Sequence, residues 1–223
     1  MFGYNELGTI RKMNRLIILT FLILTSCSSN GQNNFEGIIK FSTEITTTEL
    51  APDGFQKQLK DKYGDSLLMY YSGNGNFRRI HLNSSEFGAD SQYYFANKAK
   101  LYFTNKNSSQ VDSLDTKENS LKLLSKGKID NQKILDLDCE CYEFKAISKY
   151  NQNVTLNYCY NLNSPVINPE LYSDHNDFYL NEYYELAKRP YLKFSIKTEE
   201  FKITYLATEL TEKEIGKEIF ELK

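Results

Sequence analysis

The chain has 223 residues, 25% of them charged, and a formal net charge of −2. Its basic and acidic residues are interspersed and form no basic block, which argues against a nucleic-acid partner. It contains no tryptophan but has 17 tyrosines and 14 phenylalanines, aromatic residues that favour half-buried strands.

The only long apolar stretch, residues 16–24, follows three basic residues and ends in small residues before Cys27. A basic segment, a short apolar segment and a small-residue cleavage site predict a secretory signal peptide. As a helix of roughly 11 residues, this segment with its flanks would cover about 16 Å, roughly half of a ~30 Å hydrocarbon core. We therefore expect residues 1–26 to be a leader. Residues 1–12 include the acidic Glu6, so Met13 is the more economical start.

The end of the leader resembles the lipobox of bacterial lipoproteins. The four matching residues are Leu24, Thr25, Ser26 and Cys27. The resemblance implies cleavage before Cys27 and a diacylglyceryl group on its thiol, with a further acyl chain on the new amino group. Two or three chains hold a protein on a bilayer firmly. An ordinary signal peptide with a coincidental cysteine is the alternative.

Removal of the leader takes away three basic and one acidic residue, so the net charge of the remainder is −4. Residues 27–34 are polar and rich in Asn, which predicts a flexible tether. Residues 35–223 then suit one domain. We expect the protein at the cell envelope, on the outer membrane and facing the periplasm.

The first half of this domain predicts mostly strands and hairpins. Apolar residues alternate with polar ones over residues 35–48, which predicts a long strand. A Pro-Asp-Gly turn follows, and the charged stretch to Lys62 predicts a short helix or a loop. The sequence Gly-Asn-Gly-Asn predicts a hairpin turn. The strands predicted after the first are 65–72, 77–83, 91–97 and 100–105.

The second half begins with a polar segment, residues 106–131, whose structure the pattern leaves open. The clearest hairpin follows, with strands 133–148 and 153–161 around a turn near Tyr150. After a stretch with two prolines, residues 177–188 predict a helix stopped by a proline. Its expected apolar face holds Leu180, Tyr183, Tyr184 and Ala187. Two strands, 191–197 and 201–210, complete the domain.

Roughly ten strands and little helix predict a mainly β fold. We expect an antiparallel meander that forms an open half-barrel with one or two short covering helices. A β-sandwich is the alternative.

Three cysteines remain besides Cys27. If the hairpin turn centres on Tyr150, Cys141 lies directly opposite Cys159, within reach of a disulfide. Cys139 is the alternative partner if the register slips. The thiol left over is expected to be a small buried hydrophobe.

No pattern predicts a cofactor, a metal site or catalytic residues. A Cys-x-Cys spacing on a strand suits zinc poorly, and neither His81 nor His175 has a partner at ligand spacing. The cluster of residues 174–177, Asp-His-Asn-Asp, is interpreted as a loop and helix cap. The alternative is an enzyme built around Asp174, His175 and Asp177. No known catalytic motif matches, so we expect no enzyme.

The domain resembles GLPGLI-type and related uncharacterised envelope-lipoprotein domains. The resemblance lies in Gly-Asn-Gly-Asn before Phe-Arg-Arg, in ILDLDCECYEF before a hairpin, and in the closing IFELK; the GLPGLI hexapeptide itself is absent, with AKRPYLKFSI at its place. It implies a fold like that of periplasmic lipoprotein carriers, an open half-barrel with an apolar concave face.

The expected function is therefore non-enzymatic binding of a hydrophobic ligand, or of a partner protein of the envelope. The aromatic pairs and triplets at 70–71, 93–95 and 183–184 are expected in the core. If they are exposed instead, the alternative is a carbohydrate- or surface-binding module that stacks ligands on its tyrosines.

Overall fold

The computed structural model describes residues 34–222. The predicted leader (1–26), the lipid attachment site Cys27 and the predicted tether up to residue 33 lie outside the described residues. The compact unit of the chain begins at Asn34. The Asn34 side chain donates a hydrogen bond to the carbonyl of Gly73 and accepts one from the amide of Asn168.

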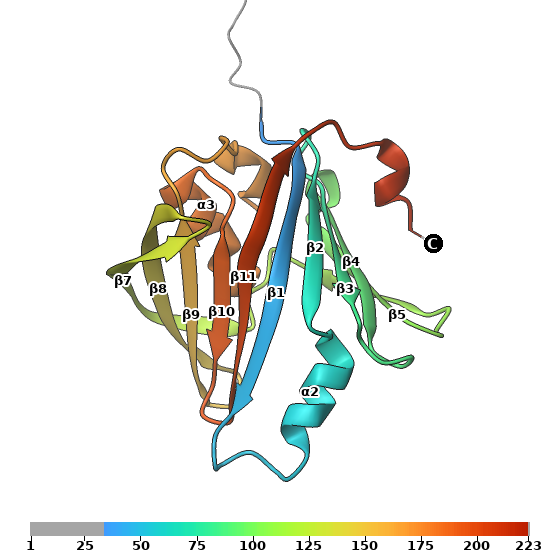
Figure 1. Cartoon of the computed structure of the whole chain (residues 1–223), viewed down its shortest axis with the longest axis vertical. Helices are drawn as coiled ribbons and strands as arrows, with labels where there is room; N and C mark the ends of the chain where they lie inside the picture. Colours follow the sequence, from blue (N-terminus) through green and yellow to red (C-terminus); the bar gives the residue numbers. More distant parts are fainter. Residues whose placement is uncertain (1–33, 223) are drawn as a thin grey trace, which may run out of the picture. The chain divides into compact units, whose positions relative to one another are not determined.

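The described residues form one antiparallel sheet of eleven strands (Figure 1). β1 and β11 are neighbours in its middle, hairpins extend the sheet on both sides, and β6 and β7 are its two edges. The strands are β1 (Gly37–Thr47), β2 (Ser66–Tyr71), β3 (Phe77–Leu82), β4 (Ala89–Phe95), β5 (Lys100–Asn105), β6 (Val111–Asp115), β7 (Leu121–Ile134), β8 (Leu137–Ser148), β9 (Asn153–Tyr160), β10 (Lys193–Lys197) and β11 (Phe201–Glu212). The predicted mainly β, open half-barrel is confirmed, and the alternative of a two-sheet sandwich is excluded.

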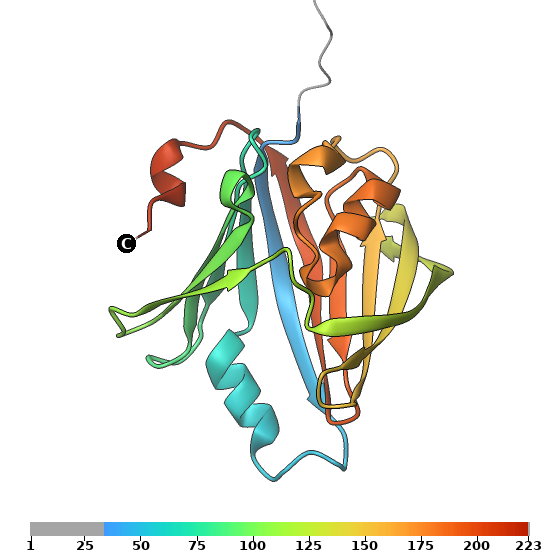
Figure 2. The same cartoon turned by 180° about the vertical axis from the view of Figure 1, so that it is seen from behind.

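The two edges of the sheet are joined by a link of five residues, 116–120, which we call the strap. Eleven strands spaced about 4.8 Å apart would make a flat sheet about 48 Å wide. The strap and its flanking residues can span at most about 22 Å. The sheet must therefore curl, and Figure 2 shows the strap crossing its concave side.

Alternation along the strands places the apolar side chains inside this curl. In β1, Ile39, Phe41 and Ile45 are buried. Lys40 and Ser42 are exposed, because successive side chains of a strand point to opposite faces of the sheet. The inner face of the curled sheet is therefore the apolar one.

Short helices cover the two ends of the concave side (Figures 1 and 2). Near one end, α2 (Phe55–Tyr63) packs Leu59 against Ile45 and Ile203 of the central strands. Near the other, α3 (Leu180–Ala187) and the 3-10 turns η2 (Pro169–Tyr172) and η3 (Asp177–Tyr179) lie over the sheet. Two further 3-10 turns are η1 (Ala96–Lys98) and η4 (Lys217–Phe220).

The apolar face predicted for the helix is confirmed residue by residue. α3 begins three residues later than expected, because η3 forms the first turn of the predicted segment. The four expected residues are the ones that α3 buries: Leu180, Tyr183, Tyr184 and Ala187.

Two segments differ from the sequence-based expectations. The polar segment 106–131, which the pattern leaves open, contains β6 and most of β7, whose side chains are largely exposed and so lack an apolar alternation. The strand predicted over 133–148 is interrupted by a two-residue turn at Leu135 and Asp136, both with positive φ. Such turns favour Asn and Gly, and this dipeptide carries no such signal.

The predicted disulfide is confirmed. Cys141 of β8 lies directly opposite Cys159 of β9, with their Cα atoms 4.1 Å apart, and the two form a disulfide. Cys139 is a buried free thiol, and burial raises its pKa. The predicted role of a small buried hydrophobe fits this environment.

The disulfide is expected to stabilise the domain. It closes a loop with a sequence separation of 18, for which the loss of chain entropy in the unfolded state is worth about 3 kcal/mol. We expect Cys141→Ala/Cys159→Ala to lower the free energy of unfolding by about this amount, measured by urea titration. The double variant should no longer respond to a reductant, and a wild-type protein equally insensitive to reductant would contradict the prediction.

Candidate functional site

A pocket of about 380 Å³ lies on the concave side of the sheet. Strands from both halves of the sheet line it, together with Tyr63 of α2, Ser120 of the strap and Phe178 of η3. Its volume lies near the lower end of the range of about 300–1,000 Å³ for small-molecule sites. The curl of the sheet therefore encloses a space large enough for one small ligand.

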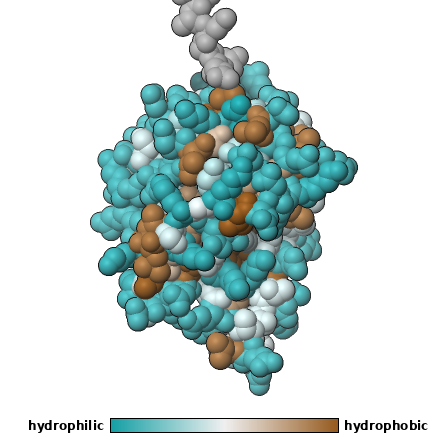
Figure 3. Space-filling model, turned by 90° about the vertical axis from the view of Figure 1, so that its left-hand side faces the viewer, coloured by the Kyte–Doolittle hydropathy of each residue, from teal (hydrophilic) through white to brown (hydrophobic). Residues whose placement is uncertain are grey.

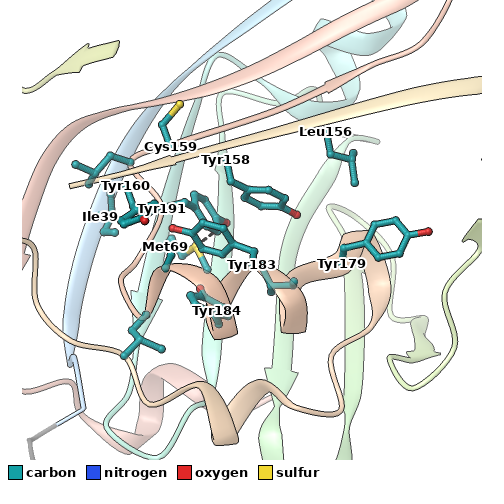
Figure 4. Close-up of a cluster of buried hydrophobic side chains, with 14 of the residues drawn as sticks. Ile39, Met69, Leu156, Tyr158, Cys159, Tyr160, Tyr179, Tyr183, Tyr184 and Tyr191 are labelled. Carbon is teal, nitrogen blue, oxygen red and sulfur yellow. Dashed lines mark hydrogen bonds between the residues drawn. The ribbon is translucent and has the colours of Figure 1, made fainter. Parts of the chain in front are cut away.

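A cluster of buried tyrosines packs between α3 and the sheet (Figure 4), and two of its members, Tyr158 and Tyr191, line the pocket. Tyr183 of α3 stacks on Tyr158 of β9, with ring centroids 4.6 Å apart. The hydroxyl groups of Tyr184 and Tyr71 lie 3.1 Å apart and form a hydrogen bond. These contacts fix α3 on the sheet, because buried ring pairs add about 0.5–1.5 kcal/mol each beyond the area they bury.

Most of the remaining lining is apolar. Leu101 and Phe103 come from β5, and Phe194 and Ile196 come from β10, on the other side of the central strands. Hydrocarbon or ring surface of a ligand would gain about 25 cal/mol per Å² from burial in such a lining.

Arg79 of β3 places a positive charge in this apolar pocket. Its guanidinium donates one hydrogen bond to the Gln92 amide oxygen, at 3.2 Å, and another to the Tyr191 hydroxyl, at 3.1 Å. Tyr191 in turn donates to the sulfur of Met69. The carbon of the guanidinium lies 4.8 Å from the centre of the Phe77 ring. Arg79 is thus positioned by neutral groups only.

The carboxyl of Asp177 and the imidazoles of His175 and His81 in the pocket are buried. Burial raises the pKa of the Asp177 carboxyl to about 6, although Arg79 acts in the opposite direction. Burial lowers the pKa of His175 to about 3 and that of His81 to about 4. Both imidazoles are therefore neutral near pH 7, and Arg79 is the cation that the pocket presents.

The predicted helix cap is wrong. α3 has no side-chain cap, since Phe178 and Tyr179 adopt positive φ values of 52° and 57° between Asp177 and the helix. This left-handed turn separates the Asp177 carboxyl from the start of α3. Positive φ at two aromatic residues is strained by about 1–3 kcal/mol each, and such strain clusters at binding sites.

The three residues of the alternative enzyme do not converge. His175 and Asp177 line the pocket, whereas Asp174 lies on the surface with its carboxylate 3.4 Å from the Lys117 amine. Within residues 34–222, no group of three or more His, Cys, Asp or Glu side chains is arranged to hold a metal ion.

The aromatic stripes do not form an exposed platform. Tyr71, Tyr93, Tyr94, Tyr183 and Tyr184 are all at most 1% exposed. The side of the molecule drawn in Figure 3 is mainly hydrophilic, with apolar side chains in small separate groups. Tyr71, Tyr94, Tyr183 and Tyr184 belong to the core, whereas Tyr70 and Phe95 are half-buried.

The strap closes part of the concave side and is tied to the loop before η3. The amide of Asn176 donates to the Thr116 carbonyl, at 2.7 Å. Two side-chain hydrogen bonds of 2.6 Å add to this contact, from Asn119 to the Asn176 carbonyl and from Asn176 to the Lys117 carbonyl. The loop that carries His175 and Asp177 is thereby fixed against the strap.

No protein-family model matches the chain, and no curated protein matches its sequence. None of the helices in the described part is long and apolar enough to cross a bilayer. The pocket's own residues therefore define which kinds of small molecule it could accept.

Sequence reasoning did not identify Arg79. The signal available was strand alternation, since Arg78 and Arg79 are consecutive in a strand and must point to opposite faces. The structure places Arg79 inside and Arg78 outside, where the Arg78 guanidinium donates to the Ile219 carbonyl.

The buried carboxyl of Asp177 should make stability depend on pH. The pKa of Asp177 is about 6 in the folded protein, above the ordinary value of 3.8. The protonated carboxyl therefore contributes to the free energy of unfolding fully below about pH 3.8, and this contribution is lost as pH rises through about 6. We expect Asp177→Asn to gain about 2 kcal/mol in free energy of unfolding relative to the wild type between about pH 4 and about pH 7.5. Urea titrations at both pH values measure this difference.

The matched control for this prediction is Asp174→Asn, three positions earlier and 57% exposed. An equal pH dependence in both variants would contradict the assignment to Asp177.

Proposed function

We propose that this protein is a lipid-anchored envelope protein that binds a hydrophobic ligand, without chemical conversion, in the pocket of its half-barrel. The observation that carries the proposal is the pocket of about 380 Å³ with its mainly apolar lining. A partner protein of the envelope is the second candidate occupant of the concave side, and the pocket's small volume favours a small molecule.

The anchor part of the proposal rests on the sequence. The lipobox-like residues before Cys27 support acylation of its thiol, and we further propose an outer-membrane location facing the periplasm. The disulfide between Cys141 and Cys159 agrees with an oxidising compartment.

The intact mass of the membrane-extracted protein tests the anchor. We expect a chain that begins at Cys27 and carries the mass of a diacylglyceryl group and an amide-linked acyl chain. Cys27→Ser should remove this processed form, because the thiol that accepts the lipid is absent. A wild-type chain that keeps its leader, or begins elsewhere without lipid, would refute the anchor.

Binding of the neutral dye N-phenyl-1-naphthylamine tests the pocket. Its fluorescence should rise on titration with the protein, because the dye enters an apolar, water-poor site. Ser120→Trp should weaken binding about tenfold, equal to about 1.4 kcal/mol, because the indole is attached at the lining of the pocket.

The matched control is Glu118→Trp, which adds the same ring to an exposed position of the strap outside the pocket lining. If both variants bind the dye as the wild type does, or if the wild type does not bind it, the pocket is not the ligand site.

A further inference from the structure

The Arg79 guanidinium forms no direct ion pair with any of the described residues. The ion pairs in this part of the chain all involve lysines. The hydrogen-bond acceptors of Arg79 are an amide oxygen and a phenol, both neutral, and its buried Nε has no acceptor. A charge removed from water without a directly hydrogen-bonded opposite charge is costly, so a ligand that brings a negative charge into hydrogen-bond contact with Arg79 would gain strongly there.

We propose that the pocket is selective for amphiphiles with a single anionic head group, which binds at Arg79 while the apolar part lies against the rings and aliphatic side chains of the pocket. This inference rests on the proposed function and adds the chemical class of the ligand. A guanidinium suits planar anions such as carboxylates, because its N–H groups form a fixed fork.

The apolar part of the ligand is limited in size. A pocket of about 380 Å³ suits one short chain or a small ring system rather than several long chains. Its apolar lining includes Leu101 and Phe103 on the same half of the sheet as Arg79, and Ile196 on the opposite half.

When its carboxyl is ionised, Asp177 repels an anionic ligand in the same pocket. The groups that act on its carboxyl are the guanidinium of Arg79 in β3, the backbone amide of Phe178 and the phenol of Tyr158 in β9. The neutral His175 of the preceding loop lines the same pocket. Protonation of Asp177 removes a negative charge from the pocket and leaves Arg79 uncompensated. Anion binding should therefore strengthen as pH falls through about 6.

Two dyes that differ only in a sulfonate group test the inference. The neutral dye is N-phenyl-1-naphthylamine, and the anionic dye is 8-anilino-1-naphthalenesulfonate, which stays ionised over the pH range used. We expect Arg79→Gln to weaken binding of the anionic dye about tenfold or more, with little change for the neutral dye. Arg79→Lys should retain part of the anionic binding because it keeps the charge.

Arg78→Gln is the matched control, since it removes the same charge from the opposite face of the same strand. It should leave both dyes unaffected. Asp177→Asn should bind the anionic dye more tightly than the wild type at about pH 7.5 and equally at about pH 5, where the wild-type carboxyl is mostly protonated.

The outcomes separate the two proposals. If the wild type binds neither dye, the proposed function fails. If the neutral dye binds but Arg79→Gln leaves the anionic dye unaffected, or Arg78→Gln weakens it equally, only the anion selectivity is overturned. If Arg79→Gln does not fold, Arg79→Lys and Asp177→Asn test the anion selectivity instead. The inference is overturned if Asp177→Asn binds the anionic dye as the wild type does at both pH values.

Discussion

The five-residue strap between the two edge strands is the constraint on which the rest of the structure depends. It joins strands that would lie far apart in a flat sheet, and so it requires the curl that creates a concave side. Its hydrogen bonds to the loop before η3 hold that loop over the concave side. The pocket and the inward position of Asp177 both depend on this closure.

The concave side of the half-barrel is tightly packed in one part and open in another. The tyrosine cluster fills the space beneath α3 with rings, and the hydroxyl groups of Tyr71 and Tyr184 form a hydrogen bond there. The neighbouring space keeps a pocket in which Arg79 and Asp177 lie without a direct ion pair. The packed side gives stability, and the unfilled side is the one available for binding.

Much of the fold could be predicted from the sequence, because burial on one face leaves a periodic pattern. Ile39, Phe41 and Ile45 predicted β1, and the apolar face of α3 was predicted residue by residue. The disulfide followed from the count of residues on either side of the turn near Tyr150. Each of these inferences depended on local spacing.

What could not be predicted lacked a local pattern. β6 and much of β7 are exposed at the edges, so their side chains show no alternation. The turn at Leu135 and Asp136 uses residues that seldom adopt positive φ. Arg79 becomes a candidate binding residue only when strands from distant parts of the chain surround it, and no single segment contains that information.

The central position of β1 and β11 has a consequence for folding. These strands come from opposite ends of the domain, with Gly37 paired to Glu212 and Thr47 paired to Phe201. The two halves of the sheet cannot be joined until the last strand is available, and pairing at such sequence separation is slow. During synthesis, which starts from the N-terminus, the strands of the two halves would therefore stay unpaired with each other until the C-terminal strand had followed.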